Sequence, residues 1–153
     1  MLVRTFDVAV ALVSWALLGA GCGQDEQVLI AAERSRFRQL APEQYVVAAC
    51  GTEIGAPCVR EVVIAGRVMT AEVADRDSAA WRPVAELGAW VDQVTRMFDA
   101  ALEEASSLRL LEFEPRWHYV SEYQLGGAAG GRRVTCFLPD RVDLQRCTPR
   151  ALP

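Results

Sequence analysis

The first apolar stretch of the chain lies close to its N-terminus. Val8 to Leu18 follows a basic start at Arg4 and precedes the small residues Gly19 to Gly21. A basic start, an apolar run and a small-residue end form the layout of a secretory signal. The apolar run has about half of the ~20 residues that a membrane-spanning helix needs. We therefore expect residues 1–21 to be a signal peptide rather than a transmembrane anchor.

Two later stretches have the apolar spacing of a helix. After a polar tether at residues 22–27, we expect an N-terminal helix over residues 28–40. Its inward positions are Ile30, Phe37 and Leu40. Pro83 suits the first turn of a second helix, which we expect to be the long one and to lie across one face of a sheet. Its apolar positions are Leu87, Val91, Val94, Phe98, Ala101, Leu102 and Ala105.

Between and after these stretches, β-branched and aromatic runs bounded by turn residues predict strands. The runs are 45–50, 59–65, 67–74, 108–114, 117–125 and 132–138. The sequence thus predicts an α+β fold, with an antiparallel sheet of about five to six strands, one long helix packed on one face and an N-terminal helix. We expect residues 28–153 to form a single domain with a disulfide-closed C-terminal tail.

The composition of the chain excludes several kinds of catalytic and metal-binding sites. All 16 cationic residues are arginine, so mechanisms that need a lysine, such as Schiff-base formation, are excluded. The single histidine, His118, excludes a zinc site built from several histidines of one chain. A net charge of −4 does not favour nucleic-acid binding. We expect no cofactor, no metal and no nucleic-acid partner.

Cysteines give a firmer prediction. Besides Cys22, the chain has Cys50, Cys58, Cys136 and Cys147. An even number in an exported chain predicts disulfides, for which three connectivities are possible. We favour the two local pairs, Cys50–Cys58 and Cys136–Cys147, because each flanks one turn. Zinc is the competing interpretation, but the spacings differ from those of C-x₂-C pairs.

The segment from Leu17 to Cys22 resembles the lipobox of bacterial lipoproteins. In that family the cysteine thiol is acylated, the preceding peptide bond is cut and the cysteine becomes the first residue. The usual large aliphatic residue three positions before the cysteine is here Gly19. The resemblance implies a palmitate-type anchor on Cys22, and Gly23 after it favours the outer membrane. The alternative is ordinary signal cleavage nearby, which gives a secreted protein.

The region after the signal resembles a family of small exported bacterial domains of unknown function. The resemblance rests on the cysteine pair near the first hairpin, on Ala65 to Val68, on Val91 to Phe98, and on Phe113 to Val120. In the family the last two features are a short helix and a strand ending in Y-D-P-x-x-G-Y-P. Glu114 replaces the aspartate of that motif. The resemblance implies a helix with an antiparallel sheet and no established activity.

Two groups of residues are candidates for a functional site. Glu112, Glu114 and Glu122 supply carboxylates on neighbouring strands, and glycosidases use two carboxylates about 5–9.5 Å apart. Alternation on a half-exposed strand gives the same pattern without chemistry. The second group is Trp117, His118 and Tyr119, an aromatic binding patch if exposed and a cap on the core if buried.

We therefore expect a lipid-anchored or secreted envelope protein whose domain is non-catalytic and binds a protein, peptide or glycan of the envelope. The first alternative is a carboxylate-dependent hydrolase that uses Glu112, Glu114 and Glu122. The second is a secreted inhibitor of another enzyme, which predicts a protruding rigid loop between Cys136 and Cys147.

Overall fold

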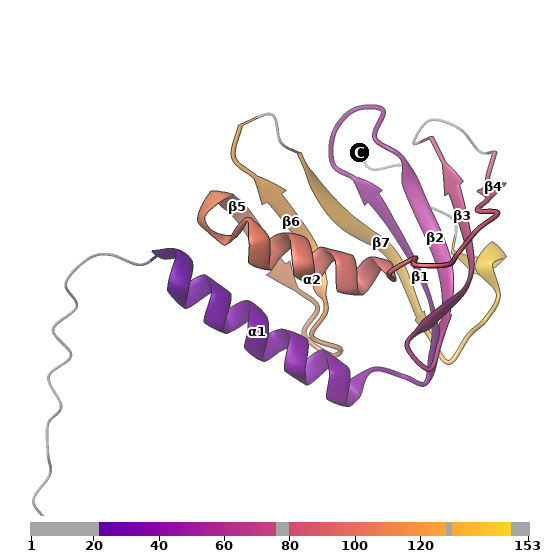
Figure 1. The fold of residues 1–153 in the computed structure, drawn as a ribbon, viewed down its shortest axis with the longest axis horizontal. Helices are drawn as coiled ribbons and strands as arrows, with labels where there is room; N and C mark the ends of the chain where they lie inside the picture. Colours follow the sequence, from indigo (N-terminus) through magenta and orange to yellow (C-terminus); the bar gives the residue numbers. More distant parts are fainter. Residues whose placement is uncertain (1–21, 76–79, 128–129, 148–153) are drawn as a thin grey trace, which may run out of the picture.

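The computed structural model describes residues 22–75, 80–127 and 130–147, in which two helices cover one face of an antiparallel sheet (Figure 1). The helices are α1 (Cys22–Leu40) and α2 (Gln93–Glu103), and short 3-10 turns are η1 (Ala105–Ser107) and η2 (Leu144–Arg146). The strands are β1 (Gln44–Gly51), β2 (Cys58–Ile64), β3 (Arg67–Ala74), β4 (Arg82–Pro83), β5 (Leu108–Phe113), β6 (Val120–Leu125) and β7 (Gly131–Pro139).

The predicted fold class, with five to six strands and one long helix, is wrong. The described residues form a seven-stranded sheet with two helices, and the longer helix is α1, with 19 residues against 11 in α2. The seventh strand, β4, has only two residues, which pair with Glu72 and Val73 of β3. A strand this short has no period of its own, so hydrophobic patterning does not detect it.

The sheet consists of two meanders that meet at its centre. Strands β1 to β4 follow one another toward one edge, and β5 to β7 run back from the other edge, giving the order β4-β3-β2-β1-β7-β6-β5. All described strand pairs are antiparallel. The two meanders join where β1 pairs with β7, from Tyr45 opposite Pro139 to Gly51 opposite Arg132. Helix α2 carries the chain between the two meanders across the sheet (Figure 1).

Helix α2 begins at Gln93 because Asp92 caps it. The Asp92 carboxylate accepts a hydrogen bond from the Thr95 N–H at 2.9 Å. A side-chain oxygen at this position satisfies a backbone donor that the first helical turn leaves free. The predicted start at Pro83 is therefore wrong, and Pro83 lies in β4.

Residues 22–27, predicted as a tether, belong to the first turns of α1. The inward side of α1 is formed by Ile30 and Phe37, which are buried, whereas Leu40 is 48% exposed and not an inward residue as predicted. Asp25 lies in the first turn, where a negative charge favours the helix.

The main core lies between the helices and the sheet. It contains the aromatic rings of Phe37 from α1, Phe98 from α2, Tyr119 from the turn before β6 and Phe137 from β7. The centroids of neighbouring rings lie 4.7–6.4 Å apart. Its largest buried side chains from α2 are Met97 and Phe98. Rings at these separations contribute packing energy beyond their buried area.

Candidate functional site

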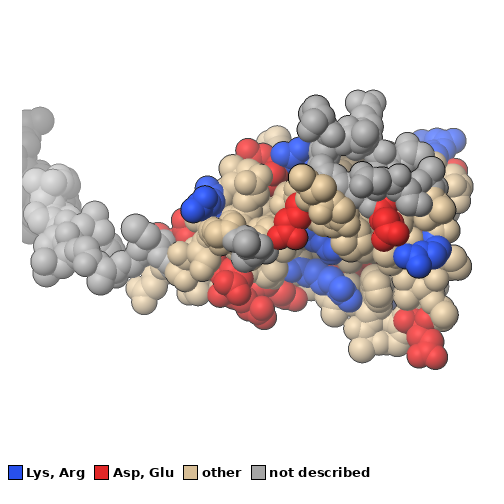
Figure 2. All heavy atoms as spheres, turned by 90° about the horizontal axis from the view of Figure 1, so that it is seen from above, with Lys and Arg blue, Asp and Glu red and all other residues tan. Residues whose placement is uncertain are grey.

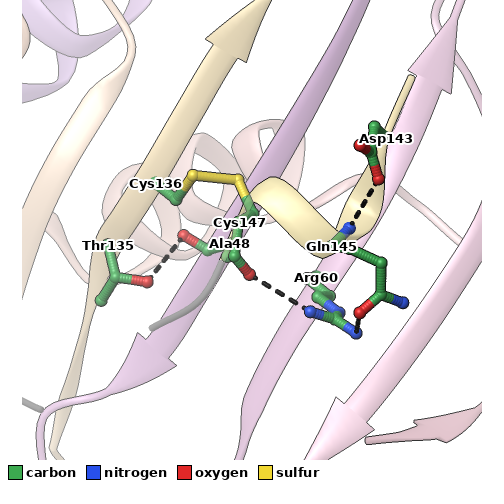
Figure 3. The surroundings of a disulfide bond; sticks show 7 residues. All are labelled: Ala48, Arg60, Thr135, Cys136, Asp143, Gln145 and Cys147. Carbon is green, nitrogen blue, oxygen red and sulfur yellow. Dashed lines mark hydrogen bonds between the residues drawn. A yellow bond between two sulfur atoms is a disulfide. The ribbon is translucent and has the colours of Figure 1, made fainter. Parts of the chain in front are cut away.

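The last described segment, from Asp140 to Cys147, lies on the face of the sheet opposite the helices, and we call it the strap. Cys147 is fully buried with Val46, Ala48 and Val62 in a second, smaller core. These positions alternate along β1 and β2 with residues of the main core, as expected for the two faces of a strand. The strap therefore covers the outer face of the sheet centre (Figure 3).

Besides a hydrogen bond from the Asp140 N–H to the Gln44 carbonyl at 2.8 Å, two links attach the strap to the sheet. One is the disulfide between Cys136 of β7 and Cys147. The other is made by Arg60 of β2, whose guanidinium donates to the Cys147 carbonyl and to the Gln145 side chain, each at 3.4 Å (Figure 3).

Arg60 is itself held on two further sides. Its guanidinium forms an ion pair with Glu72 at 2.6 Å and lies 4.2 Å from the centre of the Trp81 ring. Only 2% of Arg60 is exposed. A buried cation needs partners of this kind, because water no longer solvates it.

Both predicted disulfides are confirmed. Cys50 and Cys58 are directly opposite each other in the β1–β2 ladder and are both buried. The Cys136–Cys147 bond holds the C-terminal strap against the sheet, as the predicted disulfide-closed tail requires. In the segment closed by this bond, Cys147 is buried and Leu144 packs on the outer core, whereas residues 140–143 are exposed.

The predicted aromatic patch does not form one exposed surface. Tyr119 belongs to the main core, where its ring lies 4.7 Å from that of Phe137, and burial raises its pKa to about 12. Trp117 is half-buried and also packs on Phe137. His118 points to α1, where its Nδ1 lies 2.7 Å from the Glu33 carboxylate. These residues fasten the β5–β6 turn to the core and to α1.

The three candidate carboxylates do not share one environment. Glu112 and Glu122 are opposite each other on β5 and β6, but Glu112 is exposed and Glu122 is buried against Arg133 and Gln124. Although burial opposes ionisation, hydrogen bonds from Arg133 and Gln124 keep the pKa of Glu122 below its ordinary value. A carboxyl with a lowered pKa is a poor general acid at neutral pH.

Glu114 has a structural role in the turn after β5. Its carboxylate accepts hydrogen bonds from the backbone N–H groups of Arg116 and Trp117. An acidic side chain that binds the backbone two and three residues ahead is typical of turns. Glu114 is therefore engaged in a turn, whereas Glu112 and Glu122 are neighbours across the β5–β6 pair.

The structure brings together a buried polar cluster that sequence reasoning missed. Glu61 of β2 is fully buried, and its carboxylate accepts hydrogen bonds from the Trp90 indole at 2.9 Å and from the Gln93 N–H. Burial raises its pKa from 4.5 to about 7, against the opposing effect of these hydrogen bonds. In the sequence, the cluster is indicated by a charged residue, Glu61, in the middle of a β-branched run.

Other polar groups complete this cluster. The Tyr45 hydroxyl donates to Asp92 at 3.3 Å, and burial next to Asp92 raises the pKa of Tyr45 well above its ordinary value. Arg132 donates to the side-chain oxygen of Gln93, and its own pKa is lowered by burial. The cluster fixes the N-terminus of α2 to the centre of the sheet.

Two clefts lie at the margins of the sheet. One, of about 510 Å³, lies between β3, the segment after β4 and the strap; its lining includes Met69, Pro83, Leu87 and Leu144. The other, of about 340 Å³, lies between the end of α1 and the start of α2; its lining includes Phe37 and Tyr45. Neither contains the candidate carboxylates.

The two sheet edges differ. β3 is partly covered by β4, whereas β5 pairs on one side only among the described strands, so its other side is an open edge of the described sheet. The exposed side chains of β5 are Arg109 and Glu112. An open edge offers unpaired backbone N–H and C=O groups to another chain, and charged residues limit unselective pairing.

Cys22, the predicted acylation site, is the first residue of α1, and its side chain lies outside the described part of the structure. No helix among the described residues is long and apolar enough to span a membrane. The described residues also contain no cluster of three or more histidine, cysteine or acidic side chains fit to hold a metal ion. Acidic and basic side chains lie side by side on the surface seen in Figure 2.

Comparisons with protein-family models, with curated proteins and with solved structures gave no match.

Proposed function

We propose that this chain is a non-catalytic binding domain of the bacterial cell envelope, exported by its N-terminal signal and anchored to the outer membrane through acylated Cys22. Two disulfides carry the export part of the proposal, because such bonds persist in oxidising compartments such as the periplasm. Since α1 begins at Cys22, the anchor and the folded domain are adjacent in the chain.

The open edge of β5 supports a binding role. A row of unpaired backbone groups is complementary to another extended backbone, so it favours a protein or peptide partner over a glycan. Of the carboxylates that a hydrolase would use, Glu114 binds the backbone of a turn, Glu122 forms an ion pair and Glu112 is exposed. This arrangement favours binding over catalysis.

The test of export and anchoring is the intact mass of the protein recovered from membrane fractions of a two-membrane bacterium. We expect a chain that starts at Cys22, carries acyl groups and gains four hydrogens on reduction. Cys22→Ser is the matched control and should leave the protein without acyl mass. A wild-type chain without acyl mass would refute the anchor.

The binding role has its own test in the same cells. A photo-crosslinking amino acid at Arg109, on the β5 edge, should capture a specific envelope protein. The same amino acid at Ile54, which is fully exposed at the tip of the β1–β2 hairpin, is the control. Equal adducts from both positions, or none from Arg109, would contradict binding along this edge.

A further inference from the structure

Besides its disulfide, the strap is attached by a backbone hydrogen bond from Asp140 to Gln44, by the side chain of Arg60 and by the packing of Leu144 on the outer core. Within the described residues, hydrogen bonds from the sheet to residues 141–147 come from Arg60 alone, and both are 3.4 Å long. The remaining hydrogen bonds of these residues are internal turns, such as that from the Gln145 N–H to the Asp143 carboxylate. For residues 141–147 the disulfide is therefore the covalent attachment to the sheet, beside two long hydrogen bonds and the packing of Leu144.

The two disulfides differ in what they hold and in how accessible they are. Cys50 and Cys58 are each 2% exposed and connect strands that are already paired along seven positions. Cys136 is only half-buried, although Cys147 is fully buried. Because exchange begins with attack of a thiolate on one sulfur, an accessible sulfur raises the rate.

We propose that the Cys136–Cys147 bond is a redox-operated fastening of the strap, whereas the Cys50–Cys58 bond is permanent. The reductant is a dithiol with an accessible thiolate. This proposal goes beyond the binding function and does not depend on acylation of Cys22.

The exchange runs in two displacements. The thiolate attacks Cys136 Sγ and forms a mixed disulfide there, and Cys147 leaves as a thiolate that takes up a proton. The second thiol of the dithiol then attacks its own sulfur in the mixed disulfide and displaces Cys136, which is protonated in turn. The protein gains two electrons and two protons, and the dithiol becomes a disulfide.

Release of the strap changes the outer face of the sheet. It exposes Val46, Ala48 and Val62, which now form the small core under Cys147. It also removes two of the acceptors of Arg60, which keeps its ion pair with Glu72. The outer face of the sheet, which the strap now covers, then presents these apolar side chains beside the Arg60 guanidinium.

The first test is the order of reduction in the folded, oxidised wild-type protein. Dithiothreitol is added at neutral pH, free thiols are trapped at intervals by alkylation, and peptide masses give the fraction of each bond that is reduced. We expect Cys136–Cys147 to be reduced about tenfold faster than Cys50–Cys58, because access controls the rate. Equal rates, or faster reduction of Cys50–Cys58, would overturn the proposal.

Hydrogen exchange on the same samples separates release of the strap from unfolding. Amides of residues 141–147 should exchange faster once Cys136–Cys147 is reduced, while those of β1 and β2 stay protected. Loss of protection in β1 and β2 together with the reduction would mean that the bond opens only by unfolding of the sheet, and the proposal fails.

A pair of double variants provides the matched control. Cys136→Ala with Cys147→Ala should show the fast exchange of the strap without any reductant, whereas Cys50→Ala with Cys58→Ala should keep the strap protected. If Cys136→Ala with Cys147→Ala does not fold, the order in which the two wild-type disulfides are reduced still tests the proposal.

Discussion

Glu61 gives the sharpest prediction about stability. It is fully buried, and burial is the largest cause of its raised pKa. In the unfolded chain its pKa is near 4.5, and in the folded protein it is about 7. Between these pH values the folded state binds more protons than the unfolded state, so Glu61 lowers the free energy of unfolding as the pH rises through this window.

The magnitude follows from the difference in pKa. A difference of one pKa unit corresponds to about 1.4 kcal/mol, so Glu61 accounts for a loss of about 3 kcal/mol between pH 4.5 and pH 7. Glu61→Gln does not titrate and removes this loss. The variant should therefore be less sensitive to pH than the wild type by this amount.

The assay is urea unfolding of the oxidised protein at several pH values from 4.5 to 7.5. The quantity compared is the change in the free energy of unfolding with pH, because the amide also alters the hydrogen bonds with Trp90 and Gln93 and shifts the absolute stability. Glu112→Gln, on the exposed side of β5, is the control and should keep the wild-type profile. The reasoning is refuted if Glu61→Gln has the same pH dependence as the wild type.

Three further substitutions test other parts of the structure by urea unfolding. Tyr119→Ala should lower the free energy of unfolding by about 3–5 kcal/mol, because it empties a core site, whereas His118→Ala should cost much less; equal effects would contradict the core assignment. Arg60→Met should cost about 3 kcal/mol by removing the partner of Glu72, and a neutral result would mean that the ion pair does not stabilise the fold. Arg133→Met should cost about 1 kcal/mol at neutral pH, since Arg133 is 39% exposed; because the pKa of Glu122 is lowered, the loss should shrink as the pH falls, and a loss that grows in acid would refute the pairing.

Local patterns predicted much of the sheet. The third strand was predicted at residues 67–74 and occupies Arg67–Ala74, because a tight Ala65-Gly66 turn marks its start and alternation its length. At this turn both residues have positive φ, which glycine adopts readily and alanine does not. The disulfide pairs were also predictable, because each cysteine pair spans a short segment.

Other features depend on contacts that no local pattern contains. The stretch from Val84 to Val91 has helical spacing, but Asp92 caps α2 at a later residue and Val91 remains exposed. For Tyr119 and Trp117 the sequence allowed either a surface patch or a cap on the core, and the packing of Phe137, from β7, places them against the core. Glu61 is important only because the start of α2 lies above it, which strand periodicity does not reveal.

The position of β1 in the sheet has a consequence for export. β1 is the first strand of the described chain, yet one of its two neighbours is β7, so Ala48 pairs with Cys136 across most of the domain. Contacts between residues this far apart in the chain are slow to form. A chain that crosses a membrane from its N-terminus presents β1 with one side unpaired until β7 has emerged. In the export that we propose, the described sheet is complete only after β7 has crossed, and until then the unpaired side of β1 needs protection from aggregation.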